Sequence, residues 1–531
     1  MFELSLRSAR KSATPSQAIG VQLRCERLEE RVVPSGGALD PSFGQGGIAS
    51  TPVDGTPLGV AEQADGKLVV VLQGRLDHEG FVLTRYNADG TVDTSFGTGG
   101  LVDLAFAHHA TSCSVLIQAD GKIVVGGAAE GDQTLLWVRM TDFALARFNA
   151  DGSLDTSFGS GGTVTTPFLQ QSSGIGSIVL QTDGRILVEG DVGEVSTVAR
   201  YNTDGSLDTT FGTAGFVQLT VPGTNMYSPT MLLTFKDLEV QPDGKILIMG
   251  HINGDSSGDW LARLNADGST DESFQSIAHA LPGCSSAAFS LEPDGKIVVV
   301  GSKWILDDGD LGGLALARFN SDGTPDAGFG EAGKVSIPFT INHERVNNVM
   351  VDQQGRIIVT GSVPSGIDPF QWNGNFTLRR FNGDGTVDMT FGDGGEVSTA
   401  AAFATSSIFQ TDGKTVVVGT YPYFAPSYVV LARFLDDDGG PPPLAPQPGD
   451  GGPRSFAATG NSGPRSLVAM GHGGSTFAFS PQFFIVDGGS GSTNHSTTQP
   501  AAEVPATRGL NRRGPTSTPT DPAFLGGVFV G

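Results

Sequence analysis

The hydrophobic positions of this chain gather in short runs, each of which follows a similar polar signal. Seven times, a G-K or G-R pair, usually preceded by aspartate, introduces an apolar run rich in valine and isoleucine. The runs lie at 68–72, 123–127, 186–190, 246–250, 297–301, 357–361 and 416–420. Each run is too short for a stable helix, and a near-continuous apolar run is typical of a strand covered on both faces. The pattern therefore predicts a protein built from buried β-strands.

Two further phrases recur in step with these runs. One reads R-x-N-x-D-G, first at Arg85, and the other reads D-x-S-F-G-x-G-G, first at Asp40. Each occurs seven times, counting degraded copies such as R-F-L-D-D-D at Arg433, and the mean period is 58 residues. Asp-Gly between apolar segments predicts a tight turn, because glycine adopts positive φ without a Cβ clash. Each unit thus has four strands, a to d, with an a–b turn at D-G-K, a c–d turn at N-x-D-G, and strand d on the F-G-x-G-G phrase.

Four antiparallel strands per unit are the size of a propeller blade. We therefore predict an all-β fold, a seven-bladed β-propeller of four-stranded antiparallel blades. The repeated phenylalanine of strand d should anchor between blades, and burying one such ring contributes about 1.5–3 kcal/mol. These rings are Phe43, Phe96, Phe158, Phe211, Phe274, Phe329 and Phe391.

The order of the phrases predicts how the ring closes. The first strand-d phrase, at 39–50, precedes any strand a, b or c, whereas the seventh unit, at about 404–435, has no strand d of its own. We expect residues 39–50 to complete the seventh blade, since closure removes sheet edges that invite aggregation. The alternative is an open solenoid of seven units, which leaves the first copy unexplained.

These phrases resemble the delta-60 repeat of bacterial proteins and are similar to the NHL and YVTN propeller repeats. The resemblance covers residues 39–438 and implies a propeller-like fold without a settled activity. The segment R-L-E-E-R-V-V-P-S at 27–35 resembles an amino-terminal motif of planctomycete-type surface proteins, which implies export. We expect residues 1–38 to be a mostly disordered export-related leader and residues 439–531 to be a disordered tail rich in Gly, Pro and Ser.

The lengths of the connections differ between the two ends of each unit. The a–b and c–d turns keep a constant length, whereas the b–c and d–a connections vary from unit to unit. In an up-and-down blade, the b–c and d–a connections emerge on the same side. Variable loops on a rigid scaffold are where binding sites usually lie, so we expect the ligand on this variable-loop face.

Four aromatic residues are our candidate ligand-binding side chains. Trp137, Trp304 and Trp372 fall in long b–c segments, and Tyr227 falls in the long d–a segment at 216–238. Exposed aromatic rings on loops suit stacking on a sugar or contact with a protein partner. The alternative is that each ring packs over the edge of its own blade.

Charged residues of the repeat allow two structural interpretations. Arg147 of strand c and Asp155 of strand d could form an ion pair across the turn, repeated in every unit. The N-x-D-G turn also resembles part of a calcium loop, but Arg147 would occupy the first ligand position and no glutamate stands at the twelfth. Asx-turn capping by Asn149 and Asp151 is the better interpretation. We expect no metal site and no cofactor.

Composition narrows the classes of function. The net charge of −24 argues against nucleic-acid binding, because phosphates are neutralised by Lys and Arg. No apolar stretch is long enough for a transmembrane helix. No G-x-S-x-G elbow, Walker loop or H-E-x-x-H motif occurs, and we predict no catalytic residue.

The leading hypothesis is a secreted or cell-surface, monomeric, non-enzymatic binding or scaffold module for a protein or glycan ligand. The alternative is a polysaccharide hydrolase or lyase with carboxylates on the propeller axis. Clustered Asp, Glu, His or Tyr at the axis would favour the enzyme, and small residues would favour binding. A purely structural repeat without a specific ligand is a third interpretation.

Overall fold

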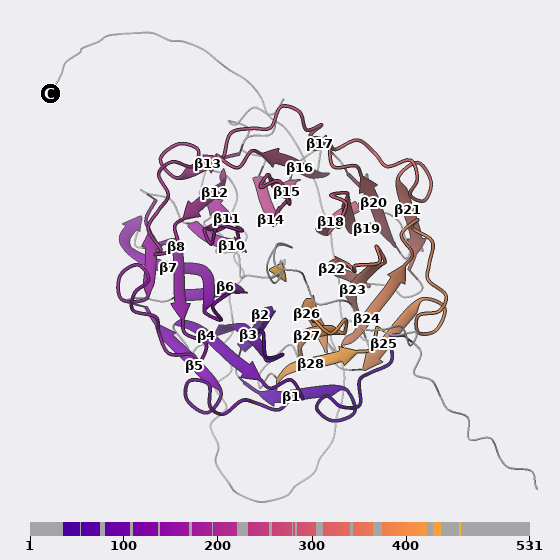
Figure 1. Ribbon diagram of the computed structural model, residues 1–531, viewed down its shortest axis with the longest axis horizontal. Coiled ribbons are helices and arrows are strands. Elements are labelled where there is room, and N and C mark those ends of the chain that lie inside the picture. Colours follow the sequence, from indigo (N-terminus) through magenta and orange to yellow (C-terminus); the bar gives the residue numbers. More distant parts are fainter. Residues whose placement is uncertain are drawn as a thin grey trace, which may run out of the picture. The chain divides into compact units, whose positions relative to one another are not determined.

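The computed structural model is a seven-bladed β-propeller, and no helix occurs in the part of the chain that it describes (Figure 1). That part comprises residues 36–53, 55–74, 80–106, 110–135, 138–168, 173–193, 195–219, 232–253, 258–278, 280–281, 284–303, 312–339, 344–364, 374–400, 402–421, 428–436 and 456–457. It accordingly contains no helix that could span a membrane.

The strands of each blade run a, b, c, d from the axis outwards, and each is antiparallel to its neighbours. Blades 1 and 2 are β2 (Gly55–Glu62), β3 (Leu68–Gly74), β4 (Gly80–Tyr86), β5 (Leu101–Ala105), and β6 (Ala110–Ile117), β7 (Ile123–Leu135), β8 (Val138–Phe148), β9 (Thr163–Thr166). Blades 3 and 4 are β10 (Ser173–Leu180), β11 (Ile186–Val192), β12 (Val195–Tyr201), β13 (Phe216–Gln218), and β14 (Leu232–Val240), β15 (Ile246–Asn253), β16 (Gly258–Leu264), β17 (Ile277–Ala278). Blades 5 and 6 are β18 (Cys284–Leu291), β19 (Ile297–Lys303), β20 (Gly313–Phe319), β21 (Lys334–Pro338), and β22 (Arg345–Val351), β23 (Ile357–Pro364), β24 (Gly374–Phe381), β25 (Glu396–Ala400). Blade 7 is β26 (Phe403–Phe409), β27 (Thr415–Tyr421), β28 (Tyr428–Phe434) and β1 (Ile48–Pro52).

The predicted ring closure is confirmed. Strand β1 pairs antiparallel with β28, with Ile48 opposite Ala432 and Pro52 opposite Tyr428. In Figure 1, β1 lies beside β28 at the outer edge of blade 7. The open solenoid is therefore wrong, since the outer strand of the last blade comes from the beginning of the chain.

Strand d begins later than the sequence predicts. The D-x-S-F-G-x-G-G phrase forms consecutive turns, and the strand starts only after the last glycine, for example at Leu101. Gly97, Gly99 and Gly100 all have positive φ, which an extended strand does not allow. The phrase therefore folds back across the blade and places its phenylalanine in the core rather than along a strand.

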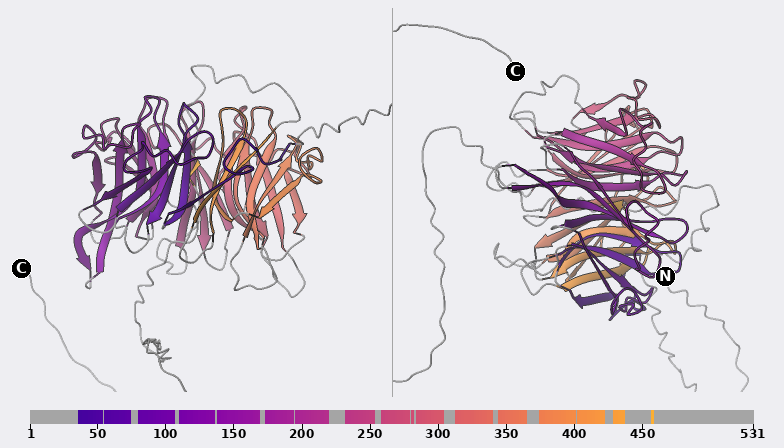
Figure 2. Two further views of the ribbon diagram at one scale, coloured as in Figure 1. Left: turned by 90° about the horizontal axis from the view of Figure 1, so that it is seen from below. Right: turned by 90° about the vertical axis from the view of Figure 1, so that its left-hand side faces the viewer.

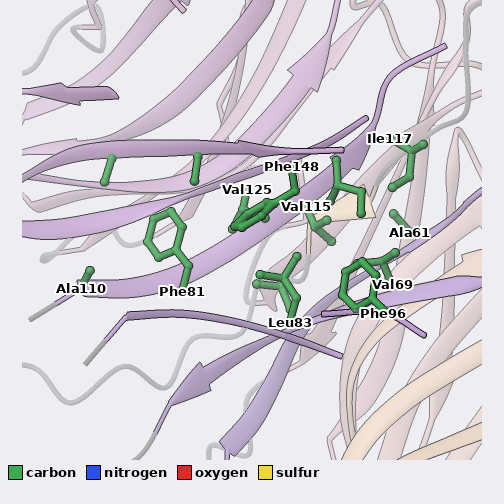
Figure 3. Close-up of a cluster of buried hydrophobic side chains, with 14 of the residues drawn as sticks. Ala61, Val69, Phe81, Leu83, Phe96, Ala110, Val115, Ile117, Val125 and Phe148 are labelled. Carbon is green, nitrogen blue, oxygen red and sulfur yellow. The ribbon is translucent and has the colours of Figure 1, made fainter. Parts of the chain in front are cut away.

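Seven hydrophobic clusters make up the core, one at each seam between neighbouring blades. Figure 3 shows the seam between blades 1 and 2, where Val69 and Phe81 of blade 1 meet Val115 and Phe148 of blade 2. Both faces of each sheet are covered, which explains the near-continuous apolar runs of strand b. The strand-d phenylalanines are buried as predicted, with Phe96 fully inaccessible to solvent.

Every innermost strand carries a β-bulge at an equivalent position. In β2, for example, the register shifts between Pro57 and Gly59, so Leu58 has no partner on β3. The same shift occurs in β6, β10, β14, β18, β22 and β26. A bulge bends its strand and re-aims the extra residue, so the ring has one such residue per blade close to the axis.

The predicted tail, 439–531, lies outside the described residues apart from one short strand, β29 (Phe456–Ala457). This strand pairs with β2, which makes the sheet of blade 1 five-stranded. The leader is likewise outside them except for residues 36–38, which belong to the ring.

Candidate functional site

The two faces of the disc are built differently. Figure 2 shows the strands running between the two faces. One face carries the a–b and c–d turns, and we call it the constant-turn face; the other, the variable-loop face, carries the b–c and d–a connections. A candidate site is a place where the side chains are not already used in contacts that hold the blades together.

On the constant-turn face, an arrangement of side chains that repeats in every blade joins each blade to the next. In blade 2, Arg147 Nε donates to Asp155 Oδ2 over 2.7 Å, and its guanidinium carbon lies 4.5 Å from the centre of the Phe158 ring. Arg147 Nη1 donates to the carbonyl of Thr203 in the c–d turn of blade 3, at 2.6 Å. One buried arginine therefore joins its own turn, its own core and the next blade. We call this set the arginine clasp.

The arginine clasp occurs in all seven blades. The Nε–Oδ2 distances are 2.7–2.9 Å and the guanidinium–ring distances 4.5–4.7 Å. The arginines are Arg85, Arg147, Arg200, Arg263, Arg318, Arg380 and Arg433. The predicted ladder of ion pairs is thus confirmed. A hydrogen bond from the Ser157 hydroxyl holds the pKa of Asp155 well below its usual value, so this carboxylate stays ionised.

The N-x-D-G turns are capped by their own side chains. Asp151 Oδ1 accepts hydrogen bonds from both the backbone N–H and the hydroxyl of Ser153, and Asn149 Nδ2 donates to the same hydroxyl. The interpretation as Asx-turn capping is confirmed, and these oxygens are already used within the turn. Within the described ranges, no group of three or more His, Cys, Asp and Glu side chains is arranged to hold a metal ion.

Two hollows of about 420 and about 370 Å³ lie in the described part of the ring. The larger is lined by strand-d and turn residues of blades 2 and 3, such as Thr165 and Tyr201. The smaller is lined by Arg200, Asp183 and other turn residues of blades 3 and 4. Arg200 belongs to the arginine clasp and Thr165 pairs within its sheet, so neither hollow is a convincing ligand site.

The candidate ligand-binding residues predicted from the sequence, Trp137, Trp304, Trp372 and Tyr227, all lie outside the described residues. Their role stays a prediction. In the sequence they fall between β7 and β8, β19 and β20, β23 and β24, and β13 and β14, which are three b–c pairs and one d–a pair.

The structure adds two aromatic side chains to this face that our sequence reasoning missed. Tyr421 and Tyr428 face each other across the end of the β27–β28 pair, with exposed fractions of 40% and 37%. Among the described residues, the only other exposed large hydrophobic side chain is Met389, which lies on the constant-turn face. The signal was present in the aromatic run Y-P-Y-F-A-P-S-Y at 421–428.

The bulges of the innermost strands contribute one extra residue per blade. The extra residues of the seven bulges are Leu58, Cys113, Gly176, Lys236, Ala287, Asn347 and Thr405. Leu58, Asn347 and Thr405 are half-buried, whereas the next residue on each strand is buried. This set contains no carboxylate or histidine, although the innermost strand β14 carries Asp237 and Glu239 elsewhere along its length.

Two carboxyl groups with perturbed pKa values lie on one face of β11. Burial raises the pKa of Glu189 well above its usual value, with Asp191 and Asp237 adding repulsion, and burial raises the pKa of Asp191 to about 6. Glu189 Oε1 is buried without a hydrogen-bond partner, and Asp191 accepts one from the Ser196 hydroxyl at 3.3 Å. Such groups could exchange protons, but Glu189 is only 1% exposed.

A third cluster lies between blades 5 and 6. Arg379 stands where the other blades have alanine or threonine, and it donates to both Glu344 and Glu396, at 3.1 and 3.0 Å. Burial raises the pKa of Glu344 to about 7, even though the guanidinium opposes this. The arginine satisfies both carboxyl groups, so the cluster is a structural bridge.

Comparison with known proteins gives a family match on the repeat itself. Six segments match the family described as domain of unknown function (DUF5122) beta-propeller: residues 63–96, 118–158, 181–211, 241–274, 292–329 and 355–391. Nearly every segment runs from the a–b turn to the strand-d phenylalanine of one blade. The corresponding stretch of blade 7 is split between its a–b turn with strands b and c and residues 40–43.

No curated protein matches the chain. Among solved structures, a polysaccharide lyase, the PL25 ulvan lyase bound to a GlcA(1-4)Rha3S saccharide, is 12% identical over 73% of this chain and 94% of its own, with a TM-score of 0.47. A protein of unknown function from Dyadobacter fermentans is 13% identical over 74% and 100%, with a TM-score of 0.40. Drosophila Plexin A, in complex with Semaphorin 1b, is 10% identical over 72% and 86%, with a TM-score of 0.38.

Proposed function

We propose that this propeller is a non-enzymatic binding module that holds a glycan or protein ligand on its variable-loop face, at the cell surface or outside the cell. The observation that carries the proposal is the difference between the two faces. The constant-turn face repeats one arginine clasp seven times, and a buried arginine and aspartate of every blade are engaged in it. All variation in connection length falls on the other face.

Exposed aromatic side chains support a ligand on that face. Tyr421 and Tyr428 are paired opposite each other at the end of β27 and β28, and both side chains are exposed. Trp137, Trp304 and Trp372 belong by sequence to b–c connections of the same face. An aromatic ring combines an apolar surface with little conformational entropy to lose, which suits stacking on a sugar ring or insertion into a protein pocket.

The composition of the seven bulges supports binding rather than catalysis. The bulge residues include no carboxylate, and Glu189 and Glu344, two of the carboxyl groups with raised pKa values, are buried. A general acid has to reach the atom to which it gives its proton. Export is supported by the amino-terminal segment at 27–35, which resembles a motif of surface proteins.

The test is a ligand screen with paired variants. The full chain is applied to a glycan array and used to capture proteins from a cell-envelope extract. We expect a ligand that is lost in the triple variant W137A/W304A/W372A and weakened in Y421A/Y428A, but retained in M389A, whose side chain is exposed on the opposite face. Binding that survives both aromatic variants and disappears in M389A would place the ligand on the constant-turn face and contradict the proposal.

One observation favours the alternative, a polysaccharide hydrolase or lyase. Glu189 and Asp191 are neighbouring carboxyl groups with raised pKa values, a feature that occurs in catalytic acids. Incubation with uronic-acid and neutral polysaccharides, followed by chromatography of the products, tests this activity. Cleavage that is lost in Asp191→Asn would support the enzyme, and unchanged polymer length would support the binding module.

A further inference from the structure

The innermost strand of blade 1 differs from the other six in having a partner on its axial side. Strand β29 pairs antiparallel with β2, with Ala457 opposite Gly59 and Phe456 opposite Val60. In the part of the chain that the structure describes, the other six sheets end at their innermost strand. The edge of a terminal strand presents unpaired backbone N–H and C=O groups, which can accept another extended chain.

The position of β29 places this pairing in the centre of the ring. Figure 1 shows the strand inside the circle of innermost strands. It lies against β2, β6, β10 and β26, which are the innermost strands of blades 1, 2, 3 and 7. The segment therefore lies among the innermost strands of these four blades, paired with that of blade 1.

Blade 1 has the local sequence that such an approach requires. The residue after the bulge is Gly59, whereas the equivalent residues of the other blades are Ser114, Ser177, Asp237, Ala288, Asn348 and Ser406. A glycine inside a strand often marks the point where another backbone comes close. The next residue, Val60, is fully buried, so the edge is held rigidly by the core of the seam.

From these observations we propose that the axial edge of β2 is a strand-accepting site for an extended polypeptide, and that the chain's own residues 456–457 occupy it. The ligand is recognised through its main chain, as in other cases of strand addition. This site is separate from the variable-loop face and does not depend on the function proposed for that face.

The length of the intervening chain permits this arrangement. Residues 435–455 separate Phe434, the last residue of β28, from Phe456, and a fully extended segment of this length spans about 70 Å. A tethered segment acts at an effective concentration on the order of millimolar. The tail therefore competes with any extended peptide that pairs with β2 from solution.

The first experiment measures hydrogen exchange of the full chain and of its Ala457→Pro variant. Proline removes the N–H of residue 457 and disfavours strand pairing, while leaving every residue of the ring unchanged. We expect the amides of residues 55–62 to exchange about tenfold faster in the variant. The other six innermost strands and the melting temperature should not change. The matched control, Ala501→Pro, lies in the same tail and should exchange like the unaltered chain.

The second experiment uses a fluorescently labelled synthetic peptide of residues 450–462. It should bind the Ala457→Pro protein at least tenfold more tightly than the unaltered protein, in which the tail fills the site, and a scrambled peptide should bind neither. Unchanged exchange of residues 55–62 in Ala457→Pro, or equal peptide binding by both proteins, would overturn the proposal. Loss of exchange protection throughout the ring would also overturn it, because the effect would then not belong to β2.

Discussion

Blade 2 and blade 7 form the same structure from differently connected chains. In blade 2, one continuous turn links strands c and d, where Gly152 N–H donates to Asn149 O and Asn149 N–H donates to Ser153 O. In blade 7, Gly37 N–H donates to Leu435 O and Leu435 N–H donates to Ala38 O, so two segments almost 400 positions apart rebuild the same turn. The turn is therefore specified by its hydrogen bonds and packing rather than by continuity of the chain.

The two blades also share the side chains that surround the turn. Arg433 and Asp40 meet at 2.9 Å in blade 7, as Arg147 and Asp155 meet at 2.7 Å in blade 2. At the split turn, Gly392 N–H donates to Gly36 O, which corresponds to the bond from Gly159 N–H to Asp204 O at a continuous turn. The two turns differ in the conformational entropy that the chain loses when each forms. The split turn has to bring together two distant segments, whereas the continuous turn forms locally.

Removal of residues 1–52 should have the largest effect. It deletes β1 and residues 36–47, so Arg433 loses Asp40 and β28 becomes an exposed edge. We expect loss of the cooperative thermal transition and aggregation on size-exclusion chromatography. The matched control removes residues 1–34 and should behave like the full chain. A deletion variant that stays monomeric with an unchanged melting temperature would show that the ring does not need its closing strand.

Replacement of the clasp arginine should have the next largest effect. Arg147→Ala leaves Asp155 buried without its main partner, which costs about 3–5 kcal/mol. Lys122→Ala removes a partly exposed pair to the same carboxylate and should cost about 0–1 kcal/mol. Chemical denaturation measures both. If the split and continuous turns are equivalent, Arg433→Ala should lower the free energy of unfolding by the same amount as Arg147→Ala, within about 1 kcal/mol. Equal losses of stability for Arg147→Ala and Lys122→Ala would contradict the role of the arginine clasp.

The split turn should give blade 7 a pH dependence that a continuous turn lacks. Arg380 contacts Asp436 at the split turn, whereas Arg147 contacts the carbonyl of Thr203. Burial raises the pKa of Asp436 to about 6, above its value of 3.8 in an unfolded chain, despite the nearby guanidinium groups of Arg356 and Arg380. Its contribution to stability is therefore present below pH 4 and lost as the pH rises through 6.

The variant Asp436→Asn removes this titration. We expect it to match the unaltered chain at pH 4 and to be more stable at pH 8 by about 1–3 kcal/mol. Asp204→Asn should change the pH dependence of stability in the opposite direction. The Ser206 hydroxyl lowers the pKa of Asp204, so the contribution of this carboxylate to stability is lost as the pH falls. Melting temperatures between pH 2 and 8 measure both, because the contribution of Asp204 is lost only below pH 4. An Asp436→Asn variant that is less stable at pH 8 would show that the two guanidinium groups outweigh burial.

Glycine replacement at the split turn should have the smallest of these effects. Gly37 has φ of +88°, and a Cβ there would lie 2.5 Å from Val397 Cγ2 and 3.0 Å from the Phe391 ring. Gly46 also has positive φ, at +64°, but a Cβ there would meet open space. Gly46→Ala should cost about 1 kcal/mol from backbone strain alone, and Gly37→Ala about 1 kcal/mol more. Equal costs in thermal melts would show that the split turn yields to the added methyl group.

Parts of this fold could be predicted from local sequence because their causes are local. The a–b and c–d turns follow from Asp-Gly, and the buried b strands follow from runs such as 297–301. The role of residues 39–50 in closing the ring follows from the order of the repeats, because the first strand-d phrase has no preceding strands and the last unit lacks one. The start of strand d was placed too early, because positive φ at Gly97, Gly99 and Gly100 ends the extended conformation before the pattern of apolar residues shows it.

The candidate site was less predictable. Trp137, Trp304, Trp372 and Tyr227 were chosen by loop membership, and the structure does not describe them. Tyr421 and Tyr428 were missed because their exposure depends on where the β27–β28 pair ends. The raised pKa values of Glu189 and Asp191 depend on burial between blades 3 and 4, which a single strand does not reveal.

The amino-acid sequence by itself determined the number of blades, the turns and the strand that closes the ring, because these follow from short-range backbone preferences repeated seven times. Only the tertiary structure decided how each arginine reaches the following blade, which carboxyl groups are buried, and that residues 456–457 pair with β2. Those features arise between segments of chain that come together only when the ring is closed, so no local pattern specifies them.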